Sequence, residues 1–202
     1  MEQPERPEAR STIFPQAWYG RDTVAVARDL LGCRLVCTAG PEPLVGRIVE
    51  TEAYLAGDPA AHSYRGPTRR NAVLFGPVGH AYVYFIYGAH HCLNAVAGPA
   101  GRGEAVLIRA LEPLAGLDVM AERRGVADPR ALCSGPGKLA QAFGITLADN
   151  GVPLYAGPLH VEAAPPGGAA AEVASGPRVG ITRAREAPLR FWLAGNRFVS
   201  RR

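Results

Sequence analysis

Hydrophobic and polar residues alternate with strand-like spacing through the middle of the chain and with helical spacing on either side of it. Apolar residues at helical spacing follow Asp22, which predicts a short helix that begins after Asp22 and ends at Gly32. Runs of β-branched and aromatic residues then predict strands. These strands span residues 34–38, 44–54, 81–87, 91–98 and 105–110, with a loop over 56–80.

Helical spacing returns in the second half of the chain. It predicts one helix over 114–124 and a second that is capped by Ser134 and ends at Gly144. The segment 163–177 is rich in Ala, Gly and Pro, which predicts an exposed loop. Two short apolar runs predict closing strands, at 179–181 and 189–193.

The order of these elements indicates the fold class. Strands gathered in the middle, with helices before and after them, are typical of α+β proteins rather than of alternating βαβ units. We therefore predict a single mixed domain over 15–202, with a central curved, largely antiparallel sheet flanked by helices. Residues 1–14 carry mixed charge and several prolines, which predicts a flexible N-terminal arm.

Composition narrows the class of protein. Hydrophobic residues make up 48% of the 202 residues and charged residues 20%, which excludes disorder as the main state. We expect neither a membrane span nor secretion, because no run of eighteen apolar residues occurs and the N-terminus is charged. The four cysteines form no C-x-x-C pair, so we expect no metal site. Phosphate-binding, dinucleotide-binding and serine-hydrolase motifs do not occur.

The basic residues favour contact with phosphate. The net charge is +4, and 21 of the 22 basic residues are arginine, whose planar guanidinium binds phosphate oxygens in pairs. Codon bias in a GC-rich genome is the simpler explanation for this excess of arginine over lysine. The candidates for contact with a nucleic-acid backbone are Arg65, Arg69, Arg70 and the only lysine, Lys138.

Two glutamates and a tyrosine occupy alternate positions at the end of the strand predicted over 44–54. Glu50, Glu52 and Tyr54 therefore share one face of that strand. A solvent-exposed edge of the sheet explains this pattern. A general base at the end of a core strand explains it as well, because burial there would position a carboxylate.

The clearest strand, 81–87, carries Tyr82 and Tyr84 on one side. Such an aromatic stripe usually belongs to a hydrophobic core, although it also fits a cleft in which tyrosines stack on bases. Asn94 and Arg109 lie on the neighbouring apolar strands and need partners if they are buried. An aromatic, hydrogen-bonding pocket that suits a flat heterocycle would be lined by Glu52, Tyr54, Tyr84, Asn94 and Arg109.

Long ordered motifs follow one another along the chain. They are GRIVETEAYL (46–55), DPAAHS (58–63), RN (70–71), FGPVGHAYVYFIYGAHHCLNAV (75–96), VLIRALEPLAG (106–116), CSGPGKLAQAFGI (133–145), PRVGI (177–181) and PLRFW (188–192). In this order they resemble the alkyladenine (3-methyladenine) DNA glycosylase family, and the resemblance extends from about residue 12 to the C-terminus.

The resemblance implies a role for each matching residue in the reaction. Glu52 matches the general base that activates a water against C1′ of a flipped nucleotide. Arg109 and the backbone carbonyl of Val179 match the groups that help to hold that water. Since the family places the base at the second glutamate, we expect Glu50→Gln to keep most of the activity.

The resemblance also implies how the substrate is held. Tyr54, His62 and Tyr84 match the pocket that sandwiches the base, and Asn94 matches the asparagine that crowds the guanine amino group. Tyr87 matches the residue that inserts into the duplex. The following Ala89 stands where we expect methionine in many relatives, which makes the tip of this hairpin less apolar.

The family activity is release of damaged purines from double-stranded DNA without a cofactor or metal. The resemblance implies a monomer that binds such DNA in the cytoplasm, at the nucleoid. A non-catalytic binder of distorted or alkylated DNA is the alternative, although it would have no use for the carboxylate of Glu52. A glycosylase that also cleaves the DNA strand would need an amine, and Lys138 lies far in sequence from the pocket motifs.

Overall fold

The computed structural model describes residues 12–166 and 171–200, and within them it contains eight strands and four α-helices. The strands are β1 (Arg34–Cys37), β2 (Leu44–Tyr54), β3 (Ala81–Ile86), β4 (His90–Ala97), β5 (Glu104–Ala115), β6 (Leu159–Glu162), β7 (Val173–Gly176) and β8 (Arg190–Leu193). The helices are α1 (Thr23–Asp29), α2 (Leu117–Arg124), α3 (Pro129–Leu132) and α4 (Pro136–Phe143). Short 3₁₀ helices span Gln16–Gly20, Ala72–Phe75 and Leu147–Asp149.

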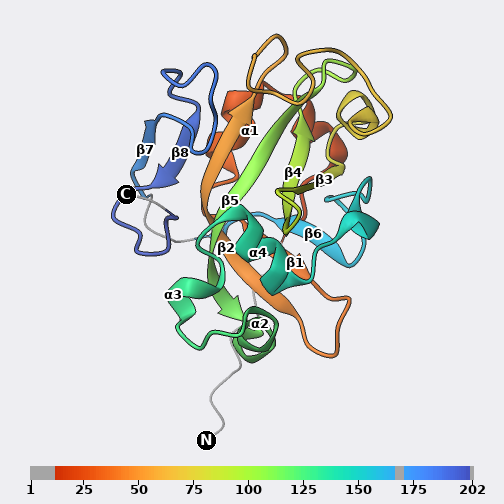
Figure 1. Ribbon diagram of the computed structural model, residues 1–202. Helices are drawn as coiled ribbons and strands as arrows, with labels where there is room; N and C mark the ends of the chain where they lie inside the picture. Colours follow the sequence, from red (N-terminus) through yellow and green to blue (C-terminus); the bar gives the residue numbers. More distant parts are fainter. Residues whose placement is uncertain (1–11, 167–170, 201–202) are drawn as a thin grey trace, which may run out of the picture.

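All eight strands join one curved sheet in which every pair is antiparallel, so the predicted α+β class is confirmed (Figure 1). The strand order is β3-β4-β5-β2-β1-β6, and β8 with its partner β7 joins at β2. One edge of β2 pairs with β5 along most of its length, while the other edge is shared between β1 and β8. Bulges on either side of Glu50 let one strand serve these neighbours, because a bulge bends and twists its strand.

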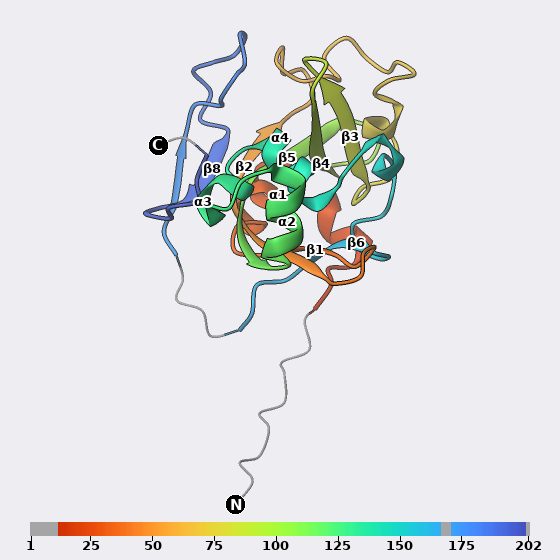
Figure 2. The same ribbon diagram turned by 60° about the horizontal axis from the view of Figure 1, so that its bottom comes forward.

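The helices pack against the sheet and bury part of the hydrophobic core. The side chain of Asp22 accepts a hydrogen bond from the amide of Ala25, so the predicted cap of α1 is confirmed. α1 packs on β2 and β5, and α4 packs on β4 and β5 with Leu139 and Phe143 buried. In Figure 2 the β3–β4 hairpin and the segment before β8 project on the side away from α2.

Two predicted helix starts are wrong. The predicted helix over 114–124 begins only at Leu117, because β5 continues as a strand to Ala115 and Gly116 then turns the chain with a φ of 73°. Ser134 is not the cap of α4: Gly135 holds that position, and the hydroxyl of Ser134 accepts a hydrogen bond from Lys138 instead.

Two predicted elements near the C-terminus are also wrong, and in both places a contact with another segment determines the backbone structure. The predicted exposed loop over 163–177 ends in β7, which pairs with β8. The predicted strand at 179–181 is irregular, and the amide of Val179 bonds a carboxylate rather than a neighbouring strand. The strand predicted at 189–193 is confirmed as β8, whereas β6 and α3 were not predicted.

Of the predicted N-terminal arm, 1–14, residues 1–11 lie outside the described residues. Within the described part, Ile13 forms a β-bridge with Glu162, and Phe14 stacks on Trp18 at 3.9 Å between ring centres. No helix among the described residues is long and apolar enough to cross a bilayer.

Candidate active site

Glu50 and Glu52 both lie on β2 with side chains that are 0% exposed, which excludes the solvent-exposed edge. Glu52 has two hydrogen-bond donors and one ion-pair partner. Its Oε1 accepts from the backbone amide of Val179 at 2.7 Å and lies 3.2 Å from Nη1 of Arg109, while its Oε2 accepts from the hydroxyl of Tyr54 at 2.8 Å. A buried carboxylate of this kind is held in one orientation by its hydrogen bonds.

Arg109 on β5 connects the two glutamates. Its Nε donates to Oε1 of Glu50 at 2.9 Å, and its Nη1 faces Glu52. Burial opposes the charge of Arg109, but the carboxylates of Glu52 and Glu50 outweigh that effect and raise its pKa above the ordinary value. The prediction that Glu50, Glu52 and Tyr54 face one side is therefore consistent with the structure, since one arginine reaches both carboxylates.

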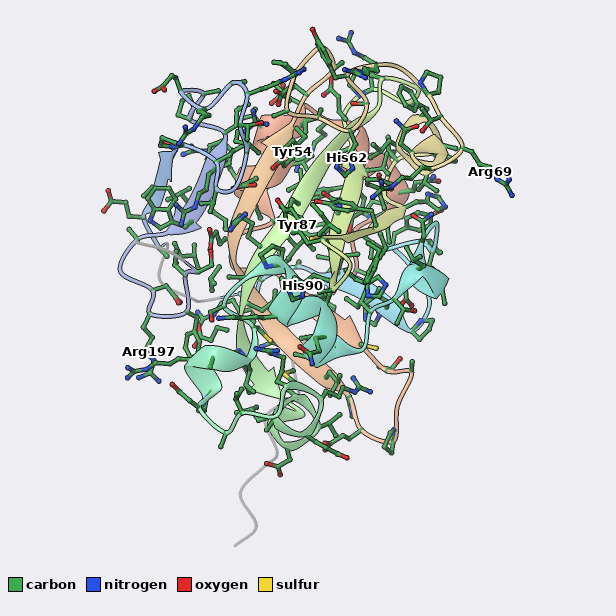
Figure 3. The ribbon with its side chains drawn as sticks, in the orientation of Figure 1. Tyr54, His62, Arg69, Tyr87, His90 and Arg197 are labelled. Carbon is green, nitrogen blue, oxygen red and sulfur yellow. The ribbon has the colours of Figure 1, made fainter. Side chains whose placement is uncertain are left out.

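A cavity of about 530 Å³ opens beside this cluster. Figure 3 shows Tyr54, His62 and Tyr87 gathered over the same part of the sheet. The structure brings nearly all the predicted pocket residues to this cavity, but Glu52 is not part of its wall. The sequence-predicted residues in the wall are Tyr54, His62, Tyr84, Tyr87, Asn94, Arg109 and Val179.

The aromatic wall comes from β3 and the preceding loop. The rings of His62 and Tyr84 meet edge to face at 4.4 Å between centres, and Nδ1 of His62 lies 3.0 Å from the hydroxyl of Tyr82. Burial, and then the charge of Arg70, lower the pKa of His62, so that its imidazole is neutral near pH 7. Burial also raises the pKa of Tyr54 and Tyr84, which keeps both phenols protonated.

Tyr87 stands at the tip of the β3–β4 hairpin with 81% of its surface exposed. Its φ of 55° is one of two positive values among the described non-glycine residues. A large aromatic ring at an exposed turn contributes little to the core. This ring is therefore free to contact a binding partner beside the cavity.

Asn94 on β4 is buried at the back of the cavity. Its Nδ2 donates to the backbone carbonyl of Tyr82 at 3.0 Å, which fixes the amide plane. The partners that the sequence required for buried Asn94 and Arg109 are therefore present in the structure.

The predicted basic residues lie at different distances from the cavity. Arg65 and Arg70 line a smaller hollow of about 290 Å³ next to it, and Nη2 of Arg70 donates to the carbonyl of Phe85. Lys138 is exposed, but its neighbour Gly137 lines the main cavity, so its distance in sequence from the pocket motifs was misleading. Arg69 points outward from the margin of the molecule (Figure 3).

Sequence reasoning missed the residues that hold the site together. Arg178 is buried, donates to the carbonyl of Ala53, forms an ion pair with Asp58 and lies 4.6 Å from the ring centre of Tyr54. The motifs PRVGI and DPAAHS contain this pair, but nothing in the sequence shows that they meet. Arg183, which lines both hollows, was missed as well.

Metal ligands do not gather anywhere in the part of the chain that the structure describes. No group of three or more His, Cys, Asp or Glu side chains there is placed to hold an ion.

Comparisons with known proteins agree with this geometry. The family model for methylpurine-DNA glycosylase (MPG) matches residues 17–197. A protein of Methanoculleus marisnigri is 60% identical over 191 residues, which cover 94% of this chain and 99% of the relative. Proteins of Rhodopseudomonas palustris and Carboxydothermus hydrogenoformans are 53% and 48% identical, over 96% and 94% of this chain and 90% and 100% of their own lengths. All three carry the name "Putative 3-methyladenine DNA glycosylase". The match over most of the chain shows that this protein belongs to the methylpurine-DNA glycosylase family.

Proposed function

We propose that this protein releases alkylated purines, 3-methyladenine among them, from duplex DNA, with Glu52 as the general base that activates a water. The observation that carries the proposal is the position of Glu52. Its carboxylate is completely buried, yet its three partners, Tyr54, Arg109 and Val179, all belong to the wall of the cavity. The protein would act as a monomer in base excision repair, in the cytoplasm and without a cofactor.

The damaged nucleotide must first leave the duplex, because a stacked base cannot reach a cavity on the enzyme. Extrusion costs a few kcal/mol, and least where damage has already weakened the pair. The exposed ring of Tyr87 stands beside the cavity and would enter the gap that the base leaves. Stacking of this ring on the neighbouring bases would offset part of the cost.

The extruded purine would lie between the rings of Tyr54, His62 and Tyr84. Alkylation at N3 or N7 makes a purine cationic, and a cationic ring is attracted to the faces of tyrosine. A neutral His62 adds no repulsion to such a base. The fixed amide of Asn94 would meet the edge of the purine and exclude the amino group of guanine.

The chemical step is a hydrolysis. A carboxylate has about four lone-pair positions, and hydrogen bonds from Val179 and Tyr54 occupy two of them on Glu52. Even with Arg109 facing Oε1 as an ion-pair partner, a position remains for a water. Glu52 takes a proton from this water while the oxygen forms a bond to C1′. The electron pair of the N-glycosidic bond leaves with the base, which needs no added proton when the lesion is cationic. The products are the free base and an abasic site.

Charge also favours the transition state. As the glycosidic bond breaks, positive charge develops on the sugar, and the nearby carboxylate of Glu52 stabilises it. Arg109 would help to orient the water, as would the backbone carbonyl of Val179. The ion pair of Arg109 with Glu52 supports the role of Arg109, because it places this guanidinium beside the proposed base.

The DNA backbone would run along the basic side chains around the cavity. Arg65, Arg70 and Arg183 surround the smaller hollow that adjoins it, and guanidinium groups bind phosphate oxygens well. Lys138 would meet the backbone near Gly137, while the outward Arg69 would contact it farther away.

The test is base release from duplexes that each carry one lesion, read as strand cleavage after alkali. We expect release of 3-methyladenine by the wild-type protein and a large loss of release in Glu52→Gln. Binding of the lesion duplex without release by the wild-type protein would contradict the proposal and favour a non-catalytic binder.

A further inference from the structure

Glu50 is a completely buried carboxylate that the proposed reaction does not use. Its Oε1 accepts hydrogen bonds from Nε of Arg109 at 2.9 Å, from Nε of Arg190 at 2.7 Å and from the hydroxyl of Ser200 at 3.0 Å. Its Oε2 accepts from the amide of Ser200 at 2.7 Å. Residues from β2, β5, β8 and the C-terminal segment therefore converge on one side chain.

The connection to the site runs through Arg109. This guanidinium donates from Nε to Glu50 and faces Glu52 with Nη1, so that it lies between the two carboxylates. A guanidinium is planar with its donors in a fixed fork, so fixing Nε also fixes the direction of Nη1. Arg109 lines the cavity, whereas Glu50 does not. Arg109 is therefore the contact through which Glu50 can act on the site.

Stability alone is a poor reason to bury this group. Removing a carboxylate from water is costly, and a buried ion pair often contributes no more to folding than apolar residues of the same volume. The two glutamates and the two arginines of this cluster balance in charge. What a charged network adds over an apolar core is a defined orientation of each member.

We propose that Glu50 is a positioning residue for the glycosylase reaction: together with Arg190 and Ser200 it holds Arg109 in the orientation in which Arg109 fixes Glu52. The inference rests on the proposed function. It replaces the expectation from the sequence that Glu50→Gln keeps most of the activity.

The first test compares Glu50→Gln with a matched control. Glu112 on β5 also binds an arginine and the C-terminal segment, since it pairs with Arg47 at 2.8 Å and accepts from Asn196 at 3.1 Å. In single-turnover excision of a 3-methyladenine duplex, we expect Glu50→Gln to lower the rate roughly ten- to a hundredfold, as for a misplaced reacting group. The affinity for the lesion duplex should not change, and Glu112→Gln should excise at the wild-type rate.

A double-mutant cycle separates positioning from a general loss of structure. If Glu50 acts through Arg109, Glu50→Gln should cause no further loss of rate in an Arg109→Gln background. Equal losses in both backgrounds, or a wild-type rate in Glu50→Gln, would overturn the proposal. If Glu50→Gln does not fold, Arg190→Gln takes its place, because it loosens Glu50 without replacing Arg109 or Glu52, and the same criteria apply.

The outcomes also separate this inference from the proposed function. A wild-type protein that releases no base, or a fully active Glu52→Gln, would refute the function itself. An active wild-type protein with an inactive Glu52→Gln and a normal Glu50→Gln would refute only the positioning role.

Discussion

Replacing Glu52 with glutamine separates the chemistry of the carboxylate from its structural contacts. Glutamine has nearly the same shape, and its carbonyl oxygen can accept from the amide of Val179 and face Arg109 as Oε1 does now. Its amide nitrogen would then face the hydroxyl of Tyr54, which donates in the native protein but can turn to accept. The one interaction lost outright is the charge attraction to Arg109.

The expected loss of stability is modest. Arg109 keeps its bond to Glu50, so its charge is not left without a partner. Weakening one charge-assisted bond costs about 1–3 kcal/mol of the free energy of unfolding. Excision should fall much further, because general base catalysis contributes about 10²- to 10⁴-fold in rate, or roughly 3–5 kcal/mol of activation free energy.

The assay is single-turnover excision at neutral pH, with thermal unfolding and lesion affinity measured on the same preparation. Glu104→Gln is the matched control: its carboxylate is also buried, and it binds Thr23 at 2.6 Å on a different side of the sheet. We expect this control to excise at the wild-type rate. A Glu52→Gln rate within about tenfold of wild type would refute the assignment of Glu52 as the base.

Three further predictions concern residues in the wall of the cavity or in the hollow next to it. Tyr87→Ala should change the free energy of unfolding by less than about 0.5 kcal/mol, since the ring is exposed. The same variant should capture the flipped base more weakly. A loss of about 3–5 kcal/mol in the free energy of unfolding would mean that the ring belongs to the core. Asn94→Ser should raise the release of normal guanine from undamaged duplex by about 1–3 kcal/mol of discrimination, and no increase would place selectivity elsewhere. Arg70→Gln should raise the pKa of His62 toward 6.5, because one of the two causes of its low value is removed, and NMR titration measures this shift. The folded chain binds a proton on His62 more weakly than the unfolded chain does, so the free energy of unfolding decreases as the pH falls below 6.5. This decrease should be smaller in Arg70→Gln than in the wild-type protein.

The sequence by itself predicted the elements whose pattern is local. The 11-residue strand β2 has the predicted bounds, and the cap of α1 lies at the predicted Asp22. Such features depend on neighbouring residues alone: strand periodicity needs only the alternation of side chains, and a cap needs only one oxygen near the next amides. The motifs likewise identified the family before any geometry was known.

Two of the predictions that failed depend on partners far away in sequence. The segment at 179–181 looks like a strand, but the amide of Val179 binds Glu52, which lies 127 residues earlier. β7 was predicted as loop because its small residues show no strand pattern, and only its pairing with β8 makes it a strand.

The tertiary structure alone decided how the site is built. Alternation placed Glu50 and Glu52 on one face of a strand, which left both an exposed edge and a buried base open. Arg109 of the neighbouring strand β5 and Ser200, 150 residues away, donate to Glu50, while the amide of Val179, 127 residues away, donates to Glu52. A pattern along the chain records which side chains share a face, but burial and charge pairing depend on which distant segments cover that face, and folding of the whole domain determines this.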